Sequence, residues 1–210
     1  MTRVLIADDH AIVRRGLRQI LEEMDGIDGV DEAANGKEAL ACIRKGTYRL
    51  VLLDISMPGN TGLEVLKTIK EERPKLPVLM LSMYPEEQYA VRALKAGASG
   101  YLTKETAADA MVAAVTKILE GGIYVSDTLA ERMAIDIGRP ADRAPHELLS
   151  DRELQIMRML AMGKTAKDIG GELAISIKTV STYRSRVLSK MGFKNNADIT
   201  RYAIQHHLLE

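Results

Sequence analysis

The sequence predicts an α/β unit built on a five-stranded, parallel, doubly wound sheet, followed by an all-α domain of four helices. Three observations predict this fold. Over residues 1–122, short apolar runs alternate five times with amphipathic helical patterns, which is typical of parallel strands joined by crossover helices. Residues 123–147 lose this alternation, and 138–145 is rich in breakers and charge, so this segment is expected to be a linker with a short helix. From residue 148 to 210 the apolar pattern has a helical period throughout.

The expected strands are short apolar runs, and a nearly continuous run such as Leu50–Leu53 indicates a strand buried on both faces. The runs lie at Val4–Ala7, around Val30–Ala34, and at Leu50–Leu53, Val78–Leu81 and Tyr101–Leu102. The helical patterns between and after them cover Ile12–Glu23, Lys37–Lys45, Leu63–Glu72, Glu86–Ala96 and Ala107–Leu119. Gly121 and Gly122 are expected to end the last of these helices.

Capping residues divide the remainder of the chain into helices. Ser126 is expected to cap the short linker helix, which runs to Ile137. Ser150 and Glu153 form a capping-box pattern at the start of the all-α domain. Four helices are expected there. The first ends at Met162, the second begins at Thr165, the third runs from Ser176 to about Met191, and the fourth covers Ala197–Leu208.

Composition and charge narrow the function classes. The chain has 29 basic and 29 acidic residues, but residues 141–210 hold 11 basic and 8 acidic ones, which indicates an anion-binding C-terminal part. The single cysteine, Cys42, excludes an internal disulfide framework and is expected to be packed rather than reactive. Aromatic residues make up 4%, which argues against stacking on RNA bases. No apolar stretch reaches the ~18 residues of a membrane helix, so we expect a soluble, cytoplasmic protein.

Charged and polar residues follow the expected strands. Asp8 and Asp9 come after the first strand, Asp54 after the third, Ser82 after the fourth and Lys104 after the fifth. Carboxyl ends of parallel strands meet at one edge of the sheet, so these side chains are expected to converge. Clustered carboxylates need a cation, and hard oxygen ligands suit Mg²⁺. With a lysine and a hydroxyl nearby, this set predicts phosphoryl transfer to a carboxylate.

These motifs resemble the receiver domain of bacterial two-component response regulators, which has a flavodoxin-like fold. The resemblance covers about residues 1–122 and is carried by residues 4–10 (VLIADDH), 53–59 (LDISMPG), 81–83 (LSM) and 100–104 (GYLTK). It implies that Asp54 accepts phosphate from a sensor histidine kinase or phosphotransfer protein. It further implies that Mg²⁺ binds Asp8, Asp9, Asp54 and the Ser56 backbone carbonyl, while Ser82 and Lys104 contact the phosphoryl group. Tyr101 would be the aromatic residue that turns inward on activation.

Two residues near this set stand apart from it. Glu105 follows Lys104 where many receivers have proline, which argues against a cis peptide bond there. His10 stands beside the acidic pair, but no second histidine or cysteine lies at ligand spacing. A structural or solvent-exposed role is therefore expected for His10.

The C-terminal part contains a helix suited to an anionic partner. Between Glu172 and Asp198 there is no acidic residue, whereas five basic residues fall there. On the helix from Ile177 to Met191, one stripe is apolar and another carries small polar side chains flanked by cations. A preceding helix and a tight turn complete a helix-turn-helix, whose second helix would enter the major groove of DNA.

This part resembles the LuxR-type helix-turn-helix. The resemblance covers roughly Leu148–Leu208 and is carried by residues 149–153 (LSDRE), 163–165 (GKT), 175–180 (ISIKTV), Tyr183-Arg184 and Lys190-Met191. Joined to a receiver, it identifies the NarL/FixJ class of response regulators. It implies base contacts from Ser181, Thr182 and Ser185, and backbone contacts from Lys178, Thr179, Arg186 and Lys190, with Tyr183 or Arg184 as further contacts. The family usually has alanine at position 170; Gly170-Gly171 here predicts a softer helix or unusually close packing.

The favoured function is thus a sequence-specific transcription factor controlled by phosphorylation, a homodimer when phosphorylated or on DNA, and not a dedicated enzyme, although it slowly loses its own aspartyl phosphate. A haloacid-dehalogenase-like phosphatase is disfavoured because it needs an acid two residues after the nucleophile, where Ser56 stands. A DNA-binding or protein-docking module with an unreactive receiver stays open. Nucleotide binding at Gly163-Lys164-Thr165 is disfavoured because the glycine of a phosphate loop is replaced by Arg158.

Overall fold

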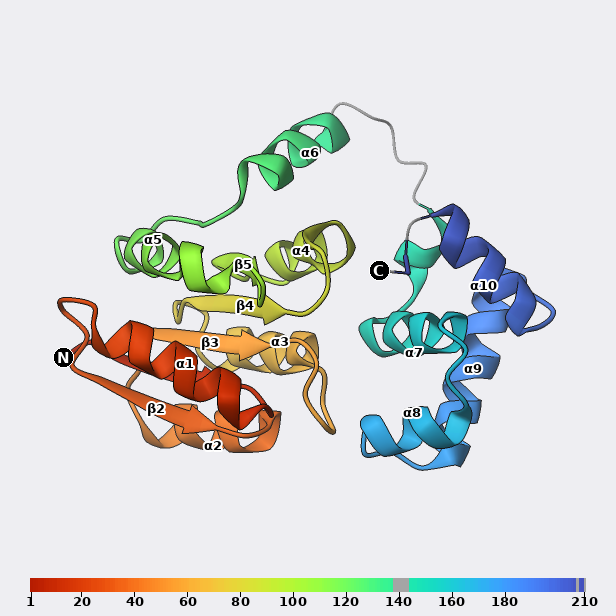
Figure 1. Cartoon of the computed structure of the whole chain (residues 1–210), viewed down its shortest axis with the longest axis horizontal. Coiled ribbons are helices and arrows are strands. Elements are labelled where there is room, and N and C mark those ends of the chain that lie inside the picture. Colours follow the sequence, from red (N-terminus) through yellow and green to blue (C-terminus); the bar gives the residue numbers. More distant parts are fainter. Residues whose placement is uncertain (138–143, 207, 210) are drawn as a thin grey trace. The chain divides into compact units, whose positions relative to one another are not determined.

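The computed structural model describes residues 1–137, 144–206, 208 and 209, and the chain forms two compact units (Figure 1). The first unit is Met1–Ile137 and the second is Gly138–Glu210. The expected linker residues 138–143 lie outside the described residues. None of the helices in the described ranges has both the length and the apolar composition that a bilayer span requires.

The first unit is a five-stranded parallel sheet with the strand order β2-β1-β3-β4-β5, which confirms the predicted sheet. Its strands are β1 (Arg3–Ala7), β2 (Gly29–Ala33), β3 (Leu50–Asp54), β4 (Val78–Ser82) and β5 (Gly100–Thr103). Asp54 pairs with Leu81 and Ser82 pairs with Thr103. Strand pairing therefore continues one residue past the apolar runs, and Asp54 and Ser82 end their strands rather than follow them.

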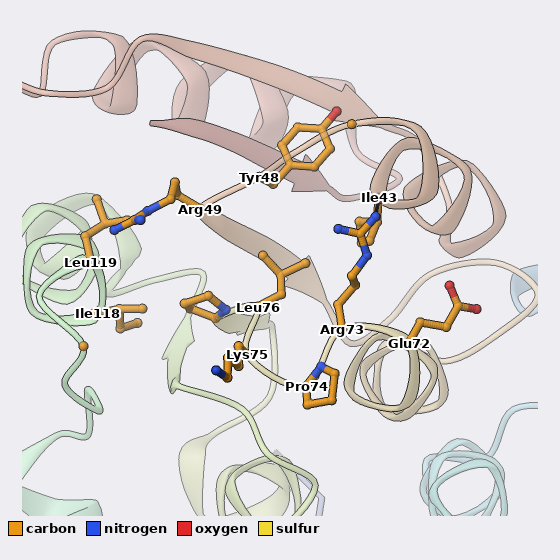
Figure 2. A pocket seen from close by; sticks show the side chains of 13 residues that line it. Ile43, Tyr48, Arg49, Glu72, Arg73, Pro74, Lys75, Leu76, Ile118 and Leu119 are labelled. Carbon is orange, nitrogen blue, oxygen red and sulfur yellow. Dashed lines mark hydrogen bonds between the residues drawn. The ribbon is translucent and has the colours of Figure 1, made fainter. Parts of the chain in front are cut away.

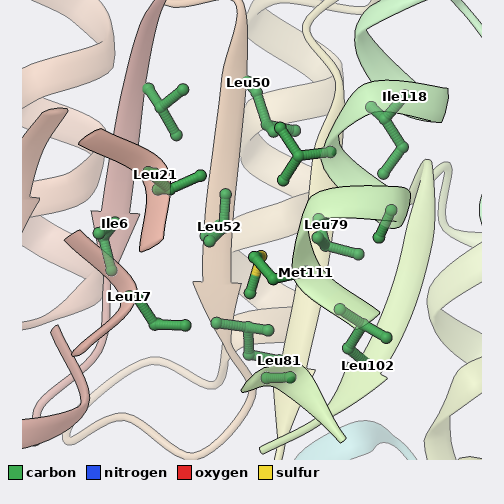
Figure 3. Close-up of a cluster of buried hydrophobic side chains, with 14 of the residues drawn as sticks. Ile6, Leu17, Leu21, Leu50, Leu52, Leu79, Leu81, Leu102, Met111 and Ile118 are labelled. Carbon is green, nitrogen blue, oxygen red and sulfur yellow. The ribbon is translucent and has the colours of Figure 1, made fainter. Parts of the chain in front are cut away.

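Helices cover both faces of this sheet (Figure 1). They are α1 (Ala11–Glu22), α2 (Gly36–Lys45), α3 (Gly62–Glu72), α4 (Glu86–Lys95) and α5 (Ala107–Leu119). The helices α1 and α5 contact each other over one face, where Leu17, Met111 and Ile118 pack against Leu52 and Leu79 (Figure 3). Each such fully buried side chain contributes about 1.5–3 kcal/mol relative to exposure, so this core fixes the strand ends in place.

The segment after α5 returns to the edge of the sheet. Tyr124 donates its backbone N–H to the carbonyl of Ser99 at 2.9 Å and forms an isolated parallel bridge with Gly100. The helix α6 (Asp127–Ile137) follows and contacts α4. Ser126 caps α6 as predicted, because its hydroxyl accepts the N–H of Leu129 at 3.1 Å. The first compact unit therefore includes the short helix that the sequence assigns to the linker.

The second unit is wholly helical in its described residues. It contains the 3₁₀ helix η1 (Pro145–Leu148) and the helices α7 (Asp151–Ala161), α8 (Ala166–Glu172), α9 (Ile177–Met191) and α10 (Asn196–Gln205). Side chains cap each of the four α-helices, with capping boxes at Ser150 and Thr165 and single caps at Ser176 and Asn195. Packing of α7 against α9 and α10, and of α8 against α9, holds the unit together.

The turn between α8 and α9 explains one of the two glycines in α8. A Cβ on Gly170 would lie 2.9 Å from the carbonyl oxygen of Ile175, whereas a Cβ on Gly171 would meet nothing within 4 Å. Ala174 adopts a left-handed φ of 53° in this turn. Close packing, one of the two predicted explanations, therefore accounts for Gly170, and Gly171 has no packing reason.

Candidate functional site

Four residues at the carboxyl ends of β1 and β3 form an acidic cluster. Ligand atoms of Asp8, Asp9, His10 and Asp54 all lie within 4.8 Å of one another. Asp8 and Asp54 are fully buried, whereas the Asp9 side chain is 27% exposed. The predicted convergence of the three carboxylates is thus present, with one carboxylate open to solvent.

His10 belongs to the cluster as well. Its Nδ1 lies 2.8 Å from Oδ1 of Asp9 and 3.3 Å from Oδ1 of Asp8. The side chain is 61% exposed, but its ring nitrogen lies in the cluster from which the sequence set His10 apart. The sequence showed only that His10 is adjacent to the acidic pair, whereas the start of α1 turns its ring back toward both carboxylates.

Lys104, the residue that follows β5, brings a positive charge into this cluster. Its Nζ lies 2.8 Å from Oδ2 of Asp54 and 2.7 Å from Oδ2 of Asp8, and its side chain is only 8% exposed. Burial raises the pKa of Asp54, and the Lys104 ammonium partly opposes this effect. Burial tends to lower the pKa of Lys104, but the carboxylates outweigh it and the pKa is raised. The lysine therefore stays charged and holds two carboxylates together.

Two serines line the same edge. The backbone N–H of Ser56 donates to Oδ1 of Asp54 at 3.1 Å, and the buried Ser56 hydroxyl has no hydrogen-bond partner among the described residues. Ser82 is fully buried, and its hydroxyl accepts the N–H of Tyr84 at 2.9 Å. In this structure Ser82 therefore bonds its own loop rather than the carboxylates.

Tyr101 lies inside the fold. Its side chain is fully buried, and its hydroxyl donates to the backbone carbonyl of Tyr84 at 2.9 Å. This bond joins β5 to the loop that carries Ser82 at its start. The structure thus has Tyr101 in an inward position, packed beside the β4–α4 loop.

The donor set fits a hard divalent cation. Three carboxylates meet within a few ångströms, and one of them, Asp9, reaches solvent. Oδ1 of Asp9 is buried and faces His10 without hydrogen-bond geometry, so it retains capacity to coordinate a metal. Oxygen ligands with open positions are the arrangement that Mg²⁺ prefers.

A second candidate site is the exposed face of α9. Val180, Val187 and Met191 are buried against the unit, which leaves the small polar side chains outward. The exposed set is Lys178, Ser181, Thr182, Ser185, Arg186 and Lys190, with Thr179, Tyr183 and Arg184 half-buried. A shallow hollow of about 490 Å³ runs along this face past Thr182 and Ser185. The predicted groove-facing residues therefore share one accessible surface.

Three of the cationic side chains near this face already have partners. Nζ of Lys190 lies 2.7 Å from Oε2 of Glu153, and Nε of Arg184 donates to Oδ1 of Asn196 at 2.7 Å. The guanidinium of Arg186 lies 5.8 Å from the ring centre of Tyr183. Sequence reasoning missed the Lys190–Glu153 pair, because the two residues belong to different helices whose packing no local pattern reveals.

Comparison with known families accounts for both sites. Residues 4–116 match the response regulator receiver domain, and residues 147–203 match the luxR family of bacterial regulatory proteins. The chain is a response regulator. It belongs to the NarL/FixJ class, because a receiver precedes a LuxR-type DNA-binding domain in one chain.

Curated relatives span the whole regulator. Response regulator UvrY of Escherichia coli K12 is 37% identical over 209 residues, covering 99% of this chain and 96% of the relative. Response regulator GacA of Pseudomonas protegens is 34% identical over 210 residues, covering 100% and 99%. The two-part arrangement is therefore shared along the full length.

Solved structures give the same result. RcsB from Salmonella enterica serovar Typhimurium, bound to promoter rprA in the presence of the phosphomimetic BeF₃⁻, matches with a TM-score of 0.66 and 27% identity, covering 96% of the regulator and 97% of that chain. Response regulator ChrA of a heme-sensing two-component system matches with a TM-score of 0.51 and 32% identity, covering 99% and 98%. The regulator therefore shares its architecture with a protein solved on DNA.

Proposed function

We propose that Asp54 is the phosphoacceptor, and that its phosphorylation by a sensor histidine kinase or phosphotransfer protein controls DNA binding by α9. The observation that carries this proposal is the position of Asp54, a buried carboxylate with Lys104 at 2.8 Å and two further aspartates beside it. A carboxylate oxygen of Asp54 attacks phosphorus as the P–N bond of the donor's phosphohistidine breaks. The released imidazole nitrogen takes up a proton.

Asp8, Asp9, Asp54 and the backbone carbonyl of Ser56 are the proposed Mg²⁺ ligands. When bound, the ion neutralises charge on the transferring phosphoryl group. The regulator's own residues do the rest: Lys104 supplies a fixed ammonium, and its two ion pairs hold the nucleophile in place. The N–H of Ser56 bonds Oδ1 of Asp54 and the Lys104 ammonium meets Oδ2, so that both oxygens of the nucleophile are oriented before the donor arrives.

Ser82 and Tyr101 are the proposed switch residues. To bond a phosphoryl group on Asp54, the Ser82 hydroxyl reorients from the N–H of Tyr84, which it accepts at 2.9 Å. The Tyr101 hydroxyl holds the carbonyl of the same residue, Tyr84, at 2.9 Å. Ser82 and Tyr101 thus both hold the β4–α4 loop through the backbone of Tyr84. A phosphoryl dianion at Asp54, which attracts Ser82, and the inward position of Tyr101 would therefore favour the same loop conformation.

The proposed DNA interface is the exposed face of α9. Ser181, Thr182 and Ser185 are short enough to reach base edges in the major groove. Lys178, Thr179, Arg186 and Lys190 flank them and would contact phosphates, with Tyr183 and Arg184 at the margin. Two copies of α9 in a homodimer would meet successive major grooves, which raises affinity without new base contacts.

The remaining parts of the proposal concern the chain as a whole. Residues 1–122 are the proposed receiver, 123–147 the linker and 148–210 the DNA-binding domain. The regulator is not a dedicated enzyme; it accepts a phosphoryl group and slowly loses it to water. Because its target is chromosomal DNA, we assign it to the cytoplasm.

The test is the intact mass of the full chain after treatment with acetyl phosphate, with and without Mg²⁺. We expect one Mg²⁺-dependent phosphoryl group on the wild type and none on Asp54→Ala. The matched control is Asp109→Ala, an exposed aspartate on α5, which should label like the wild type. Labelling of Asp54→Ala at wild-type stoichiometry would contradict the assignment.

The DNA interface is tested by selection from a library of randomised duplexes. Thr182→Ala should change base preference at one position by an amount on the order of 1 kcal/mol. Thr116→Ala, an exposed threonine on α5, is the control. An unchanged preference in Thr182→Ala would remove this residue from the base-contacting set.

A further inference from the structure

The first unit contains a cavity that neither candidate site uses. It has a volume of about 640 Å³ and lies at the amino ends of β3 and β4, between the end of α2, the end of α5 and the loop 73–77 (Figure 2). Asp54 lies at the opposite end of β3, about 17 Å away by strand length. The volume is within the ~300–1,000 Å³ typical of small-ligand sites.

The cavity has an apolar floor and a cationic rim. Ile43 and Ile118 are each 1% exposed, and Leu76 lies between them at an intermediate exposure. Arg49 and Arg73 stand on either side of Leu76 in the close-up view (Figure 2). Lys75 is the third cation of the rim, and all three cationic residues are exposed at the surface.

The charge of this rim is only partly neutralised within the unit. The acidic residue of the lining, Glu72, is held by Arg44, whose Nε donates to Oε2 at 2.9 Å. Neither Arg49 nor Lys75 makes a side-chain hydrogen bond or ion pair with any described residue. Arg73 makes a long contact, 3.4 Å, to the backbone carbonyl of Ile43 and interacts electrostatically with Glu72. Arg49 and Lys75 are therefore the cations most available to an anion.

The rim is also held in place without a ligand. Pro74 and Pro77 restrict the backbone of the loop, and the N–H of Leu76 donates to the carbonyl of Arg73 at 3.0 Å. The Lys70 ammonium donates to the carbonyl of Leu76 at 2.7 Å. Because the loop is already ordered, a ligand would lose little free energy to organising it.

We propose that this cavity binds a small amphipathic carboxylate, an organic acid with one carboxylate and an unbranched or aromatic apolar body. The apolar body would lie on Ile43, Leu76 and Ile118, and the carboxylate would meet the rim, where a guanidinium offers two parallel donors. A membrane surface is a poorer occupant, because the apolar residues are recessed behind the cations instead of projecting. The proposal is independent of the phosphorylation proposed above.

The test uses the ¹⁵N-labelled full chain and decanoate below its micelle concentration. Amide shifts should move saturably, with a Kd at or below about 1 mM, and should be largest in residues 43–49, 72–77 and 118–121. Decylammonium, which has the same apolar body with the opposite charge, should not bind there. Shifts spread elsewhere, no saturation, or equal binding of both probes would overturn the proposal.

Matched variants separate the rim cations from general surface charge. The double variant Arg49→Gln with Lys75→Gln should bind decanoate on the order of tenfold more weakly, because the loss of each exposed charge weakens the affinity a few-fold. Arg15→Gln removes an exposed cation on α1 and should bind like the wild type. Equal affinity in all three proteins would overturn the proposal, as would binding to phosphatidylglycerol vesicles in place of free decanoate.

Discussion

Gly62 is the position where a single methyl group should disturb the phosphoacceptor. It is the first residue of α3, and its N–H donates to the carbonyl of Ile55 at 2.9 Å. A Cβ added there would lie 2.1 Å from the carbonyl oxygen of Asp54 and 2.8 Å from Cα of Ile55. Both neighbours are backbone, so no side-chain rotation relieves the overlap. Gly62→Ala must therefore move either the end of β3 or the start of α3.

The size of the effect follows from this geometry. Real Cβ atoms essentially never approach another heavy atom within 3.0 Å, so a separation of 2.1 Å demands a shift of at least 0.9 Å along that line. Overpacking of a tight interior costs about 1–3 kcal/mol, and loss of the Gly62 hydrogen bond adds about 1 kcal/mol. We expect the free energy of unfolding of the first unit to fall by about 2–4 kcal/mol, which corresponds to a decrease of roughly 8–16 °C in Tm for a unit of this size.

Calorimetry and acetyl phosphate labelling of the same sample would measure both consequences. Labelling is done well below the melting transition, so that any loss reports displacement of Asp54 rather than unfolding. Gly16→Ala is the control: this exposed position in α1 has nothing within 4 Å of a Cβ, and alanine should stabilise by about 0.5–1 kcal/mol. Wild-type Tm together with full labelling in Gly62→Ala would refute the reasoning.

Four further predictions concern the second unit and the acidic cluster. Gly171→Ala should raise the stability of the second unit by about 0.5–1 kcal/mol, whereas Gly170→Ala should lower it; equal urea midpoints would contradict the packing argument. Glu153→Gln should free the Lys190 ammonium and strengthen non-specific DNA binding, with a steeper salt dependence in titrations; weaker binding would count against this. Burial tends to raise the pKa of Glu153, but its bonds to Lys190 and Ser150 lower the pKa overall. The stability that this carboxylate contributes is therefore present above about pH 4.5 and is lost on acidification through the lowered pKa. Chemical denaturation should show that the wild type is more stable than Glu153→Gln above this pH and that the difference shrinks below it. Because burial raises the pKa of Asp54, its carboxyl in the Mg²⁺-free chain should titrate above the pKa of about 3.9 for an exposed aspartate; a ¹³C carboxyl titration at or below that value would exclude the shift.

The convergence at the sheet edge could be predicted because it depends on chain topology alone. Once the apolar runs are taken as parallel strands, the residues that end them must lie at one edge, and Asp8, Asp54 and Lys104 do. The helix caps were equally predictable, because a cap is a bond between residues three positions apart. Ser150, Thr165 and Ser176 all begin helices as expected.

Contacts between distant elements could not be predicted. Whether Lys190 meets a phosphate or Glu153 depends on how α9 crosses α7, and the residue pattern of α9 carries no record of this crossing. The 3₁₀ helix η1 was missed because Pro145 begins it inside a breaker-rich stretch that resembles a linker. Periodicity could not place Tyr101 inward or Ser82 against Tyr84 either, since these depend on side-chain torsions.

The return of the chain to β5 has a consequence for self-association. β5 is an edge strand, and an open edge invites pairing with a strand of another molecule. Tyr124 occupies part of that edge through its bond to Ser99, and a Cβ on Gly100 would lie 2.9 Å from the Tyr124 carbonyl oxygen, so only glycine admits so close an approach. A receiver cut at residue 122 would lose this cover and expose a template for intermolecular β-sheet. The residues just past the receiver thus protect it against aggregation as well as joining it to its partner domain.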